Sequence, residues 1–381
     1  MEFLYLKVTQ VPYIHYSMTI EQFAKDFPVV SRYCYLNTAA SGLIGESLME
    51  WRQNHDIDFL IGGSEFRIKA DQTVNGVRAD VAKYFKAEVQ ETFLTPNFTF
   101  ALKTLVHGMD RNQSVLLLED DYPSLSFPFT SNGFKVDTIA VTSELEDSIL
   151  HYFKNNTPDI FAFSLVQYIS GIKLDISFVN GLKKDYPKVL FVADATQYSG
   201  MEMFSFKDSG IDVYGGSGYK WLLSGYGNAY LLVKEEHHNT FHSNTLTMEP
   251  LEQTFLKSKS HLQLHLEAGH LDTLNIGSLG YSLKQFTAIG QDQIQTHIAE
   301  LASYAKDQFL ALGCLDEIVA KRTVSHSSIF NIEISEKQAQ LLRERDIVYS
   351  IRGKGVRLSF HVYNTKKDVD KVVKLLRNTQ R

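Results

Sequence analysis

The sequence predicts an α/β fold in which a large, mostly parallel sheet is followed by a smaller C-terminal α+β domain. Between about residues 75 and 235, short apolar runs alternate with helical patterns, which is typical of parallel strands joined by crossover helices. After about Gly280 the pattern changes to a long amphipathic segment, followed by short strands and a final helix. Together these two observations define the predicted architecture.

Six apolar runs in the first region have the length and composition of buried strands. They are Ser114–Glu119, Lys135–Val141, Asp159–Tyr168, Val189–Ala193, Ile211–Tyr214 and Asn228–Val233. Helical patterns lie between several of them, for example over Phe98–Val106 and over Asp175–Asp185, where Pro187 stops the helix. We therefore expect a large domain over residues 35–280.

The C-terminal region predicts a smaller domain over residues 281–381, which residues 1–34 are expected to join. Tyr281–Leu312 has the periodicity of one long amphipathic helix. Thr365 and Asp368 have the spacing of a capping box, which places the start of the last helix there. No linker-like or repetitive tract separates the two domains, so we expect a fixed interface between them.

Composition and charge exclude several classes of protein. The chain has 381 residues, of which 44% are hydrophobic and 22% charged, and its formal net charge is -6. This balance lacks the basic surface that nucleic acids require, and no apolar run is long enough to span a bilayer. The two cysteines, Cys34 and Cys314, are too few for a disulfide framework. We therefore expect a cytoplasmic protein with no nucleic-acid or membrane partner.

A glycine-rich segment before Lys220 is the most informative stretch of the sequence. Gly215, Gly216 and Gly218 precede the lysine, and aromatic residues flank it. A P-loop needs Gly-Lys-Ser/Thr, which this segment lacks, and no Gly-x-Gly-x-x-Gly follows an early strand. A lysine in a desolvated pocket loses proton affinity and becomes a nucleophile toward an aldehyde. The alternative for this residue, taken alone, is a surface lysine on a turn.

Asp194 provides a second signal. It follows Val189–Ala193 and so lies at the carboxyl end of a predicted strand, where open α/β sheets bind their ligands. A carboxylate there would keep the pyridine nitrogen of pyridoxal 5'-phosphate (PLP) protonated, which lets the ring accept electrons. A strand-terminal aspartate followed by a glycine-rich lysine therefore predicts a PLP site in which Lys220 forms the Schiff base.

The segments Asp194–Gln197 and Ser217–Lys220 resemble the paired cofactor motifs of the class V aminotransferase and cysteine desulfurase superfamily, which includes selenocysteine lyase-like enzymes. The resemblance extends from about Tyr35 to the C-terminus. It implies the fold type I architecture of PLP-dependent transferases, PLP as the cofactor, an α-amino acid as the small-molecule substrate and a homodimer. It also implies that Lys220 and Asp194 are the catalytic residues.

The same resemblance assigns further cofactor contacts. Asn97 and Phe98 correspond to the turn whose backbone N–H groups hold the phosphate, and a helix N-terminus also suits an anion on physical grounds. Ser217 keeps a phosphate-binding hydroxyl, while Tyr219 stands where the family commonly has histidine. The remaining assignments are Tyr122 against the pyridine face, Gln167 or Tyr168 and Gln197 near the ring hydroxyl, and Thr273 on the phosphate of the partner subunit.

Substrate contacts are implied at both ends of the chain. Asn37 and Ala39 lie in a segment, Tyr35–Ser41, that resembles the opening segment of the family near the substrate. Arg357 resembles the arginine that holds the substrate α-carboxylate, a task suited to a planar guanidinium. The alternative for Arg357 is a structural arginine that bridges a strand and a helix.

Three histidines, His261, His265 and His270, lie close to Glu267 and raise a metal hypothesis. No catalytic glutamate lies between the first two, as the helical zinc motif requires. We therefore predict no metal site and prefer a hydrogen-bonded interface cluster of histidines.

The sequence leaves three functions open. A class V aminotransferase-type reaction is preferred, and the alternatives are a C–S or C–Se lyase and a non-catalytic binding protein with the PLP fold. The intact set of Lys220, Asp194, Gln197 and Arg357 argues against a non-catalytic protein. Cysteine desulfurases of the superfamily carry a catalytic cysteine shortly before the Arg-x-Ser segment, and residues 346–356 contain none. We therefore expect no persulfide-forming desulfurase activity.

Overall fold

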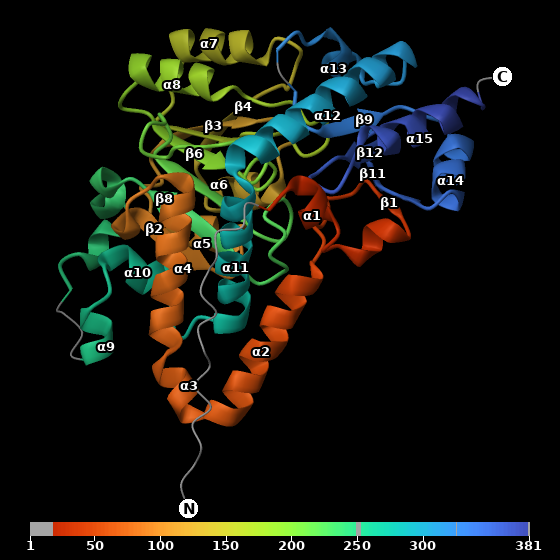
Figure 1. Ribbon diagram of the computed structural model, residues 1–381. Coiled ribbons are helices and arrows are strands. Elements are labelled where there is room, and N and C mark those ends of the chain that lie inside the picture. Colours follow the sequence, from red (N-terminus) through yellow and green to blue (C-terminus); the bar gives the residue numbers. More distant parts are fainter. Residues whose placement is uncertain (1–17, 249–252, 325, 380–381) are drawn as a thin grey trace, which may run out of the picture.

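A seven-stranded sheet forms the centre of the protein (Figure 1). The computed structural model describes residues 18–248, 253–324 and 326–379. In spatial order the strands are β2 (Thr92–Thr95), β8 (Ala229–Val233), β7 (Val213–Ser217), β6 (Leu190–Asp194), β5 (Ile160–Ser164), β3 (Ser114–Leu118) and β4 (Lys135–Ile139). Strand β8 is antiparallel to both of its neighbours, whereas β4, β3, β5, β6 and β7 pair in parallel. The predicted large, mostly parallel sheet is confirmed.

All six predicted strands are present in this sheet, and its seventh strand, β2, was not predicted. Strand β2 has only four residues, too few to show a pattern, and it pairs with β8 from Thr92 opposite Leu232 to Thr95 opposite Ala229. Strand β7 begins later than predicted and runs into the glycine-rich segment. The strand candidate before Lys220 was therefore placed too early, because glycine and serine lack the apolar side chains that indicate a buried strand.

Helices cover both faces of the sheet. On one face, the hydrophobic core includes residues of α4 (Ala70–Phe85), α7 (Leu145–Asn155), α8 (Ile176–Asp185) and α11 (Thr273–Ile289). On the other face, it includes residues of α5 (Phe98–His107), α6 (Pro123–Ser131) and α10 (His261–Leu266). Successive residues of β5 point to opposite faces, so Phe161 and Phe163 belong to the first core, and Ile160 and Ala162 to the second. Burial on both faces explains why the strands read as continuous apolar runs.

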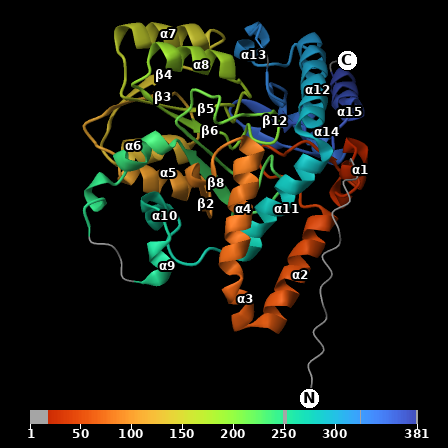
Figure 2. The same ribbon diagram turned by 60° about the vertical axis from the view of Figure 1, so that its left-hand side comes forward.

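The N-terminal part of the described chain forms α1 (Ile20–Ala24) and a helical hairpin. The hairpin consists of α2 (Glu46–Gly62), α3 (Ser64–Ile68) and the start of α4, and its tip extends away from the sheet (Figure 2). The short helix α9 (Thr254–Lys257) precedes α10. Among the described residues, no helix is both long and apolar enough to cross a membrane.

The C-terminal part contains a small antiparallel sheet covered by helices. Its strands lie in the order β11 (Ser350–Arg352), β12 (Gly355–Ser359) and β9 (Ile329–Ile332). The helices are α12 (Gln291–Ala311), α13 (Glu317–Lys321), α14 (Glu336–Glu344) and α15 (Lys366–Arg377). A short strand β1 (Cys34–Tyr35) pairs in parallel with β10 (Ile347–Val348), so the chain around residue 34 lies against this part. Of the N-terminal segment expected to join it, residues 1–17 lie outside the described residues.

The prediction of one helix over Tyr281–Leu312 is wrong. Helix α11 begins earlier, at Thr273, and ends at Ile289, because the next residue, Gly290, has a φ of +98° that is incompatible with a helix. Helix α12 then starts in a new direction, because a glycine can take this backbone conformation at little cost. Residue 280, where the domain boundary was predicted, lies inside α11. The capping box at Thr365 and Asp368 is confirmed at the start of α15.

A buried ion pair joins α4, α10 and the edge strand β2. Glu267 accepts from Nη2 of Arg78 at 2.9 Å and from the backbone N–H of Leu94 at 2.9 Å, and Nη1 of Arg78 also donates to the carbonyl of Thr92 at 3.0 Å. Both side chains are almost fully buried. The pair therefore provides hydrogen-bond partners for backbone groups at the free edge of β2, where no further strand pairs among the described residues.

We expect Glu267→Ala to lower the free energy of unfolding by about 3 kcal/mol, because it leaves the Arg78 guanidinium buried without its charge partner. The measurement is urea denaturation followed by circular dichroism. The matched control is Glu317→Ala, which removes an exposed pair with Lys321 and should leave the unfolding midpoint unchanged. Equal midpoints for the two variants would contradict the structural role assigned to Glu267.

Candidate active site

A cavity of about 240 Å³ lies at the carboxyl ends of β5, β6 and β7. Ligands of open α/β sheets bind at this edge of the sheet. The predicted cofactor residues that line it are Asn97, Phe98, Tyr122, Tyr168, Asp194, Gln197, Ser217, Tyr219 and Lys220. The structure therefore brings together residues that are more than 120 positions apart in the sequence.

Lys220 follows β7 and is buried, with 6% of its surface exposed. It is therefore not the surface lysine that its sequence context alone also allowed. Its Nζ lies 5.3 Å from the ring centroid of Tyr122 and 5.5 Å from that of Tyr219. The pKa of the amine is lowered to about 8, and burial is the largest cause. The negative charge of Asp194 opposes this shift, whereas the positive charges of Arg357 and Arg352 contribute to it. A much larger fraction of this amine is therefore neutral near pH 7 than of an ordinary lysine.

Asp194 ends β6 and is also buried. Its Oδ1 accepts a hydrogen bond from the backbone N–H of Thr196 at 2.8 Å. Burial raises the pKa of the carboxyl, whereas the Thr196 hydrogen bonds and the charge of Lys220 oppose this shift. A carboxylate in this position would gain stability from a cationic ligand group in the cavity.

The N-terminus of α5 lines one end of the cavity. The side chain of Asn97 caps the helix by accepting from the backbone N–H of Phe100 at 2.8 Å. The backbone N–H of Phe98 donates to Oγ of Ser217 at 3.0 Å, and the hydroxyls of Thr99 and Ser124 lie 2.6 Å apart. Hydroxyls and first-turn amides converge here in the way that a phosphate group requires.

The glycines before Lys220 lie in close contact with other parts of the chain. A Cβ built on Gly218 would lie 2.2 Å from Oδ1 of Asn228 and 2.3 Å from Oγ of Ser224. One on Gly216 would lie 3.1 Å from the backbone nitrogen of Thr196. These glycines therefore allow the chain to pack closely against itself and hold the lysine loop beside β6.

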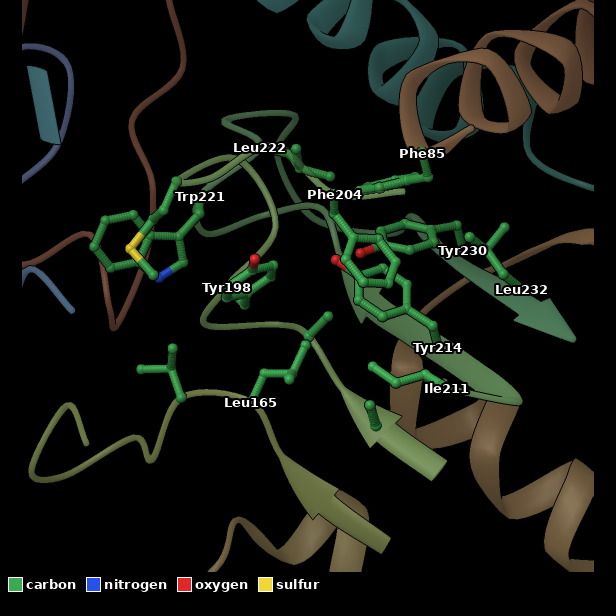
Figure 3. Close-up of a cluster of buried hydrophobic side chains, with 14 of the residues drawn as sticks. Phe85, Leu165, Tyr198, Phe204, Ile211, Tyr214, Trp221, Leu222, Tyr230 and Leu232 are labelled. Atoms are coloured by element: carbon green, nitrogen blue, oxygen red, sulfur yellow. The ribbon is translucent and has the colours of Figure 1, made fainter. Parts of the chain in front are cut away.

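Gln197 and Trp221 connect the lysine loop to the N-terminal segment. The side-chain amide of Gln197 donates to the carbonyl of Ala39 at 2.9 Å, and its oxygen accepts from Nε1 of Trp221 at 2.6 Å. Figure 3 shows the Trp221 ring among the buried side chains on this side of the sheet. The Trp221 carbonyl in turn accepts from Nε2 of His361 at 2.9 Å. This chain of contacts restrains the residue that follows Lys220.

Two predicted cofactor residues do not line the cavity. The side-chain oxygen of Gln167 accepts from the backbone N–H groups of Ile169 and Ser170 at 2.6 and 2.7 Å, so it shapes the loop after β5. Its neighbour Tyr168 lines the cavity instead. Thr273 begins α11, where its hydroxyl lies 2.9 Å from Nε2 of His55, and its assignment to the phosphate of the partner subunit remains a prediction.

None of the predicted substrate residues, Asn37, Ala39 and Arg357, lines the cavity, but Arg357 and Ala39 contact residues that do. Arg357 is buried, and its Nη1 donates to the carbonyl of Tyr168 at 2.7 Å. Burial lowers the pKa of Arg357 to about 10, and its Nε has no hydrogen-bond partner among the described residues. Asn37 accepts from the Ser350 hydroxyl at 2.7 Å, and the backbone N–H of Ala39 donates to Oγ of Ser359 at 2.9 Å. Arg357 therefore keeps unused donors next to a residue that lines the cavity.

Sequence reasoning missed six residues that line the cavity: Thr99, Ser124, Ser164, Val166, Thr196 and Tyr226. Thr196 lies inside the motif that was recognised, so its hydroxyl offered a signal. Tyr226 stacks on Tyr219 with a centroid distance of 4.6 Å, and Tyr122 meets Tyr168 edge-on at 5.1 Å. Two pairs of tyrosines therefore border the cavity, and only the tertiary fold brings them together.

The histidines of the metal hypothesis have separate partners. His261 lies 3.0 Å from the carbonyl of Phe241 through Nε2, and His265 stacks on His242 with a centroid distance of 3.8 Å. Nε2 of His270 lies 3.1 Å from Nη2 of Arg67. Glu267 is engaged by Arg78, so these four side chains do not converge on one point.

Comparison with known proteins agrees with this geometry. The family Aminotransferase class-V matches residues 46–372. The chain is 21% identical to an uncharacterized aminotransferase, YcbU, of Bacillus subtilis over 92% of this chain and 95% of that one. It is 23% identical to a probable cysteine desulfurase of Ureaplasma parvum over 91% and 94% of the two chains.

Two solved structures share the fold. The apo cysteine desulfurase of Thermococcus onnurineus has a TM-score of 0.78 at 18% identity, over 94% of this chain and 97% of that one. The cystine C–S lyase C-DES, in complex with its product cysteine persulfide, has a TM-score of 0.80 at 13% identity, over 92% and 98%. Because the family match covers most of the sequence, this chain belongs to the class V aminotransferase family.

Proposed function

We propose that this chain is a PLP-dependent enzyme that acts on an α-amino acid through Lys220, with amino-group transfer as its reaction. The observation that carries the proposal is a buried lysine with a lowered pKa that lines the same cavity as a buried carboxylate. Desolvated lysines of this kind react with aldehydes, and membership of the family identifies the aldehyde as PLP. A non-catalytic protein has no need to bury an amine in this way.

The residues of the cavity fit this cofactor. Lys220 would bind its aldehyde carbon, and the Asp194 carboxylate would accept a hydrogen bond from its protonated pyridine nitrogen. The first turn of α5 and Ser217 would hold its phosphate, and the Tyr122 ring would cover one face of the pyridine. When bound, PLP accepts the electrons that the substrate Cα releases. The raised pKa of Asp194 agrees with a carboxyl that awaits a cationic partner.

Lys220 and Arg357 would divide the work on the substrate. The unused donors of Arg357 would hold the α-carboxylate, which orients the amino acid in the cavity. The Nζ of Lys220, freed from the cofactor by the substrate amine, would take the proton from Cα as a general base. Because its pKa is near 8, this amine can accept a proton near neutral pH and return it.

A C–S or C–Se lyase is the second candidate, and the similarity to the C–S lyase C-DES supports it. A persulfide mechanism finds no support in the cysteines. Cys34 is buried and its thiol donates to Oδ1 of Asp368 at 3.3 Å, and burial raises its pKa strongly. Burial also raises the pKa of Cys314 to about 11. Neither thiol lines the cavity, so neither is a suitable thiolate nucleophile.

We also propose that the enzyme is a homodimer. The tip of the helical hairpin exposes Leu60 and Ile61 by 84% and 81%, and Phe59 and Ile68 are exposed beside them. Apolar groups of this size are usually covered by a partner. Symmetric dimers are the commonest form of soluble oligomer, and the family resemblance implies the same assembly.

The products distinguish the two candidate reactions. With an amino donor and a 2-oxo acid acceptor, we expect the donor's amino group to appear on the acceptor with no release of ammonia. A lyase that eliminates the thiol would instead convert L-cysteine and water into hydrogen sulfide, ammonia and pyruvate. Chromatography of the amino acids and an ammonia assay measure the outcome. Mass spectrometry after incubation with L-cysteine should find no persulfide on Cys34 or Cys314, and a persulfide that turns over would reverse this assignment.

The binding of PLP by the cofactor-free protein should report the pKa of Lys220. Only the neutral amine attacks the aldehyde, and with a pKa of about 8 its fraction rises about fivefold from pH 7 to pH 8 and less than twofold from pH 8 to pH 9. An ordinary lysine would show about a tenfold rise over each step. The rate is followed by visible absorbance, and borohydride reduction with peptide mapping should place the cofactor on Lys220. A tenfold rise that continues to pH 9 would argue for another lysine.

Asp194→Asn should reduce kcat by about 100-fold, because a neutral amide cannot stabilise a protonated pyridine nitrogen. Cofactor content should stay close to that of the wild type, since Lys220 and the phosphate-binding residues remain. Asp175→Asn is the control: it changes the same residue type at the start of α8, where asparagine caps a helix equally well. Wild-type turnover of the Asp194 variant would refute the assignment.

A further inference from the structure

The hairpin formed by β11 and β12 carries two arginines on one face. Ser350 pairs with Arg357, and Arg352 pairs with Gly355. Side chains alternate along each strand, so Arg352 and Arg357 project to the same side of the hairpin. Arg357 is the buried residue already described, whereas Arg352 is exposed.

This hairpin packs against the loop after β5, at the side of the cavity that Tyr168 lines. Its turn residue Gly353 has a φ of +54°, and a Cβ built there would lie 2.9 Å from Cγ2 of Ile169. The preceding residue of that loop, Tyr168, lines the cavity and accepts from Arg357. The carbonyl of Arg352 is held by Nδ2 of Asn331 at 2.8 Å. The backbone that carries Arg352 is therefore fixed beside the cavity.

The positive charge of Arg352 influences the pKa values of Arg357, Lys220 and Tyr168. Burial is the largest cause of the lowered pKa of Arg357, and repulsion by Arg352 is the next largest. Arg352 also lowers the pKa of Lys220, and it opposes the raised pKa of Tyr168, which burial and the charge of Asp120 produce. Three cationic groups thus act on this end of the cavity.

Arg352 has donors to spare. Its Nη1 donates to the carbonyl of Ile351 at 2.8 Å, and no carboxylate among the described residues pairs with it. A guanidinium presents five N–H donors, so most of them face no protein acceptor. Arg357 can neutralise only one carboxylate of a substrate. A second anionic group would be needed to offset the repulsion between the two arginines.

We propose that Arg352 binds an anionic group at the end of the substrate side chain, so that the preferred substrates are α-amino acids with a side-chain carboxylate or phosphate. The inference rests on the proposed function, in which Arg357 holds the α-carboxylate. Arg352 is then the residue that determines specificity for the second anion.

Kinetics with pairs of one anionic and one neutral substrate test the inference. The pairs are L-aspartate with L-asparagine, L-glutamate with L-glutamine, and O-phospho-L-serine with L-serine, and they distinguish a carboxylate from a phosphate. We expect kcat/KM of the anionic member to exceed that of its neutral analogue at least about tenfold in one pair. Arg352→Gln should reduce that ratio about tenfold, which corresponds to about 1.4 kcal/mol.

Lys354→Gln is the matched control, because it removes one positive charge from the turn of the same hairpin. It should leave the ratio within about twofold, since exposed charges at a distance contribute little. If all three ratios lie near one, or if both variants reduce the ratio equally, the inference is wrong.

Binding measurements separate this inference from the proposed function. Glutarate and 3-phosphonopropionate carry two anionic groups and no amine, whereas butyrate carries one. By calorimetry, we expect one of the two dianions to bind at least about tenfold more tightly than butyrate to the wild type and to the Lys354 variant, but not to the Arg352 variant. If no amino acid is turned over while this pattern holds, the proposed function fails and the anion site stands. Equal binding of the three ligands overturns the anion site.

Discussion

The burial of the Lys220 amine in the same cavity as the Asp194 carboxylate is the constraint on which the rest of the site depends. Removing an ammonium group from water is costly, so the group responds by losing proton affinity. Its pKa of about 8 results from that cost, offset in part by the carboxylate. The same low-polarity surroundings raise the pKa of Asp194. A pair of groups whose pKa values move in opposite directions is typical of a site of catalysis rather than of a stabilising ion pair.

Such a pair persists only if the surrounding structure holds it in place. Here β6 and β7 end side by side, and the closely packed glycines keep the lysine loop against β6. The hydrogen bonds from Trp221 to Gln197 and from His361 to Trp221 anchor the next residue. Burial lowers the pKa of His361 to about 3, so its ring stays neutral and serves only as a hydrogen-bond donor there. The folding energy of the two hydrophobic cores thus maintains an arrangement that is unfavourable in isolation.

The fold itself does not select the reaction. Proteins that resemble this chain include an uncharacterized aminotransferase, a probable cysteine desulfurase and a C–S lyase, at identities of 13 to 23%. What differs between such enzymes is the set of side chains around the shared cavity. In this chain, that set contains tyrosines, a lysine and an aspartate, and neither of the two cysteines. Arg357 contacts one of these tyrosines, Tyr168, at its carbonyl. The side chains around the cavity therefore determine the substrate, whereas the sheet determines where the cavity lies.

The sequence by itself predicted six of the seven strands of the large sheet, the lysine and the aspartate that share the cavity, and most of the residues that line it. These features depend on local signals: continuous apolar runs mark strands buried on both faces, and Asp194 and Lys220 lie directly after such runs. Only the tertiary structure decided the break at Gly290, the role of the glycines, and the placing of Gln167 outside the cavity and Tyr226 at its border. Each of these depends on a backbone angle or on a contact between distant segments. Local periodicity carries no information about such contacts, because it records which face of an element is buried and not which other segment covers it.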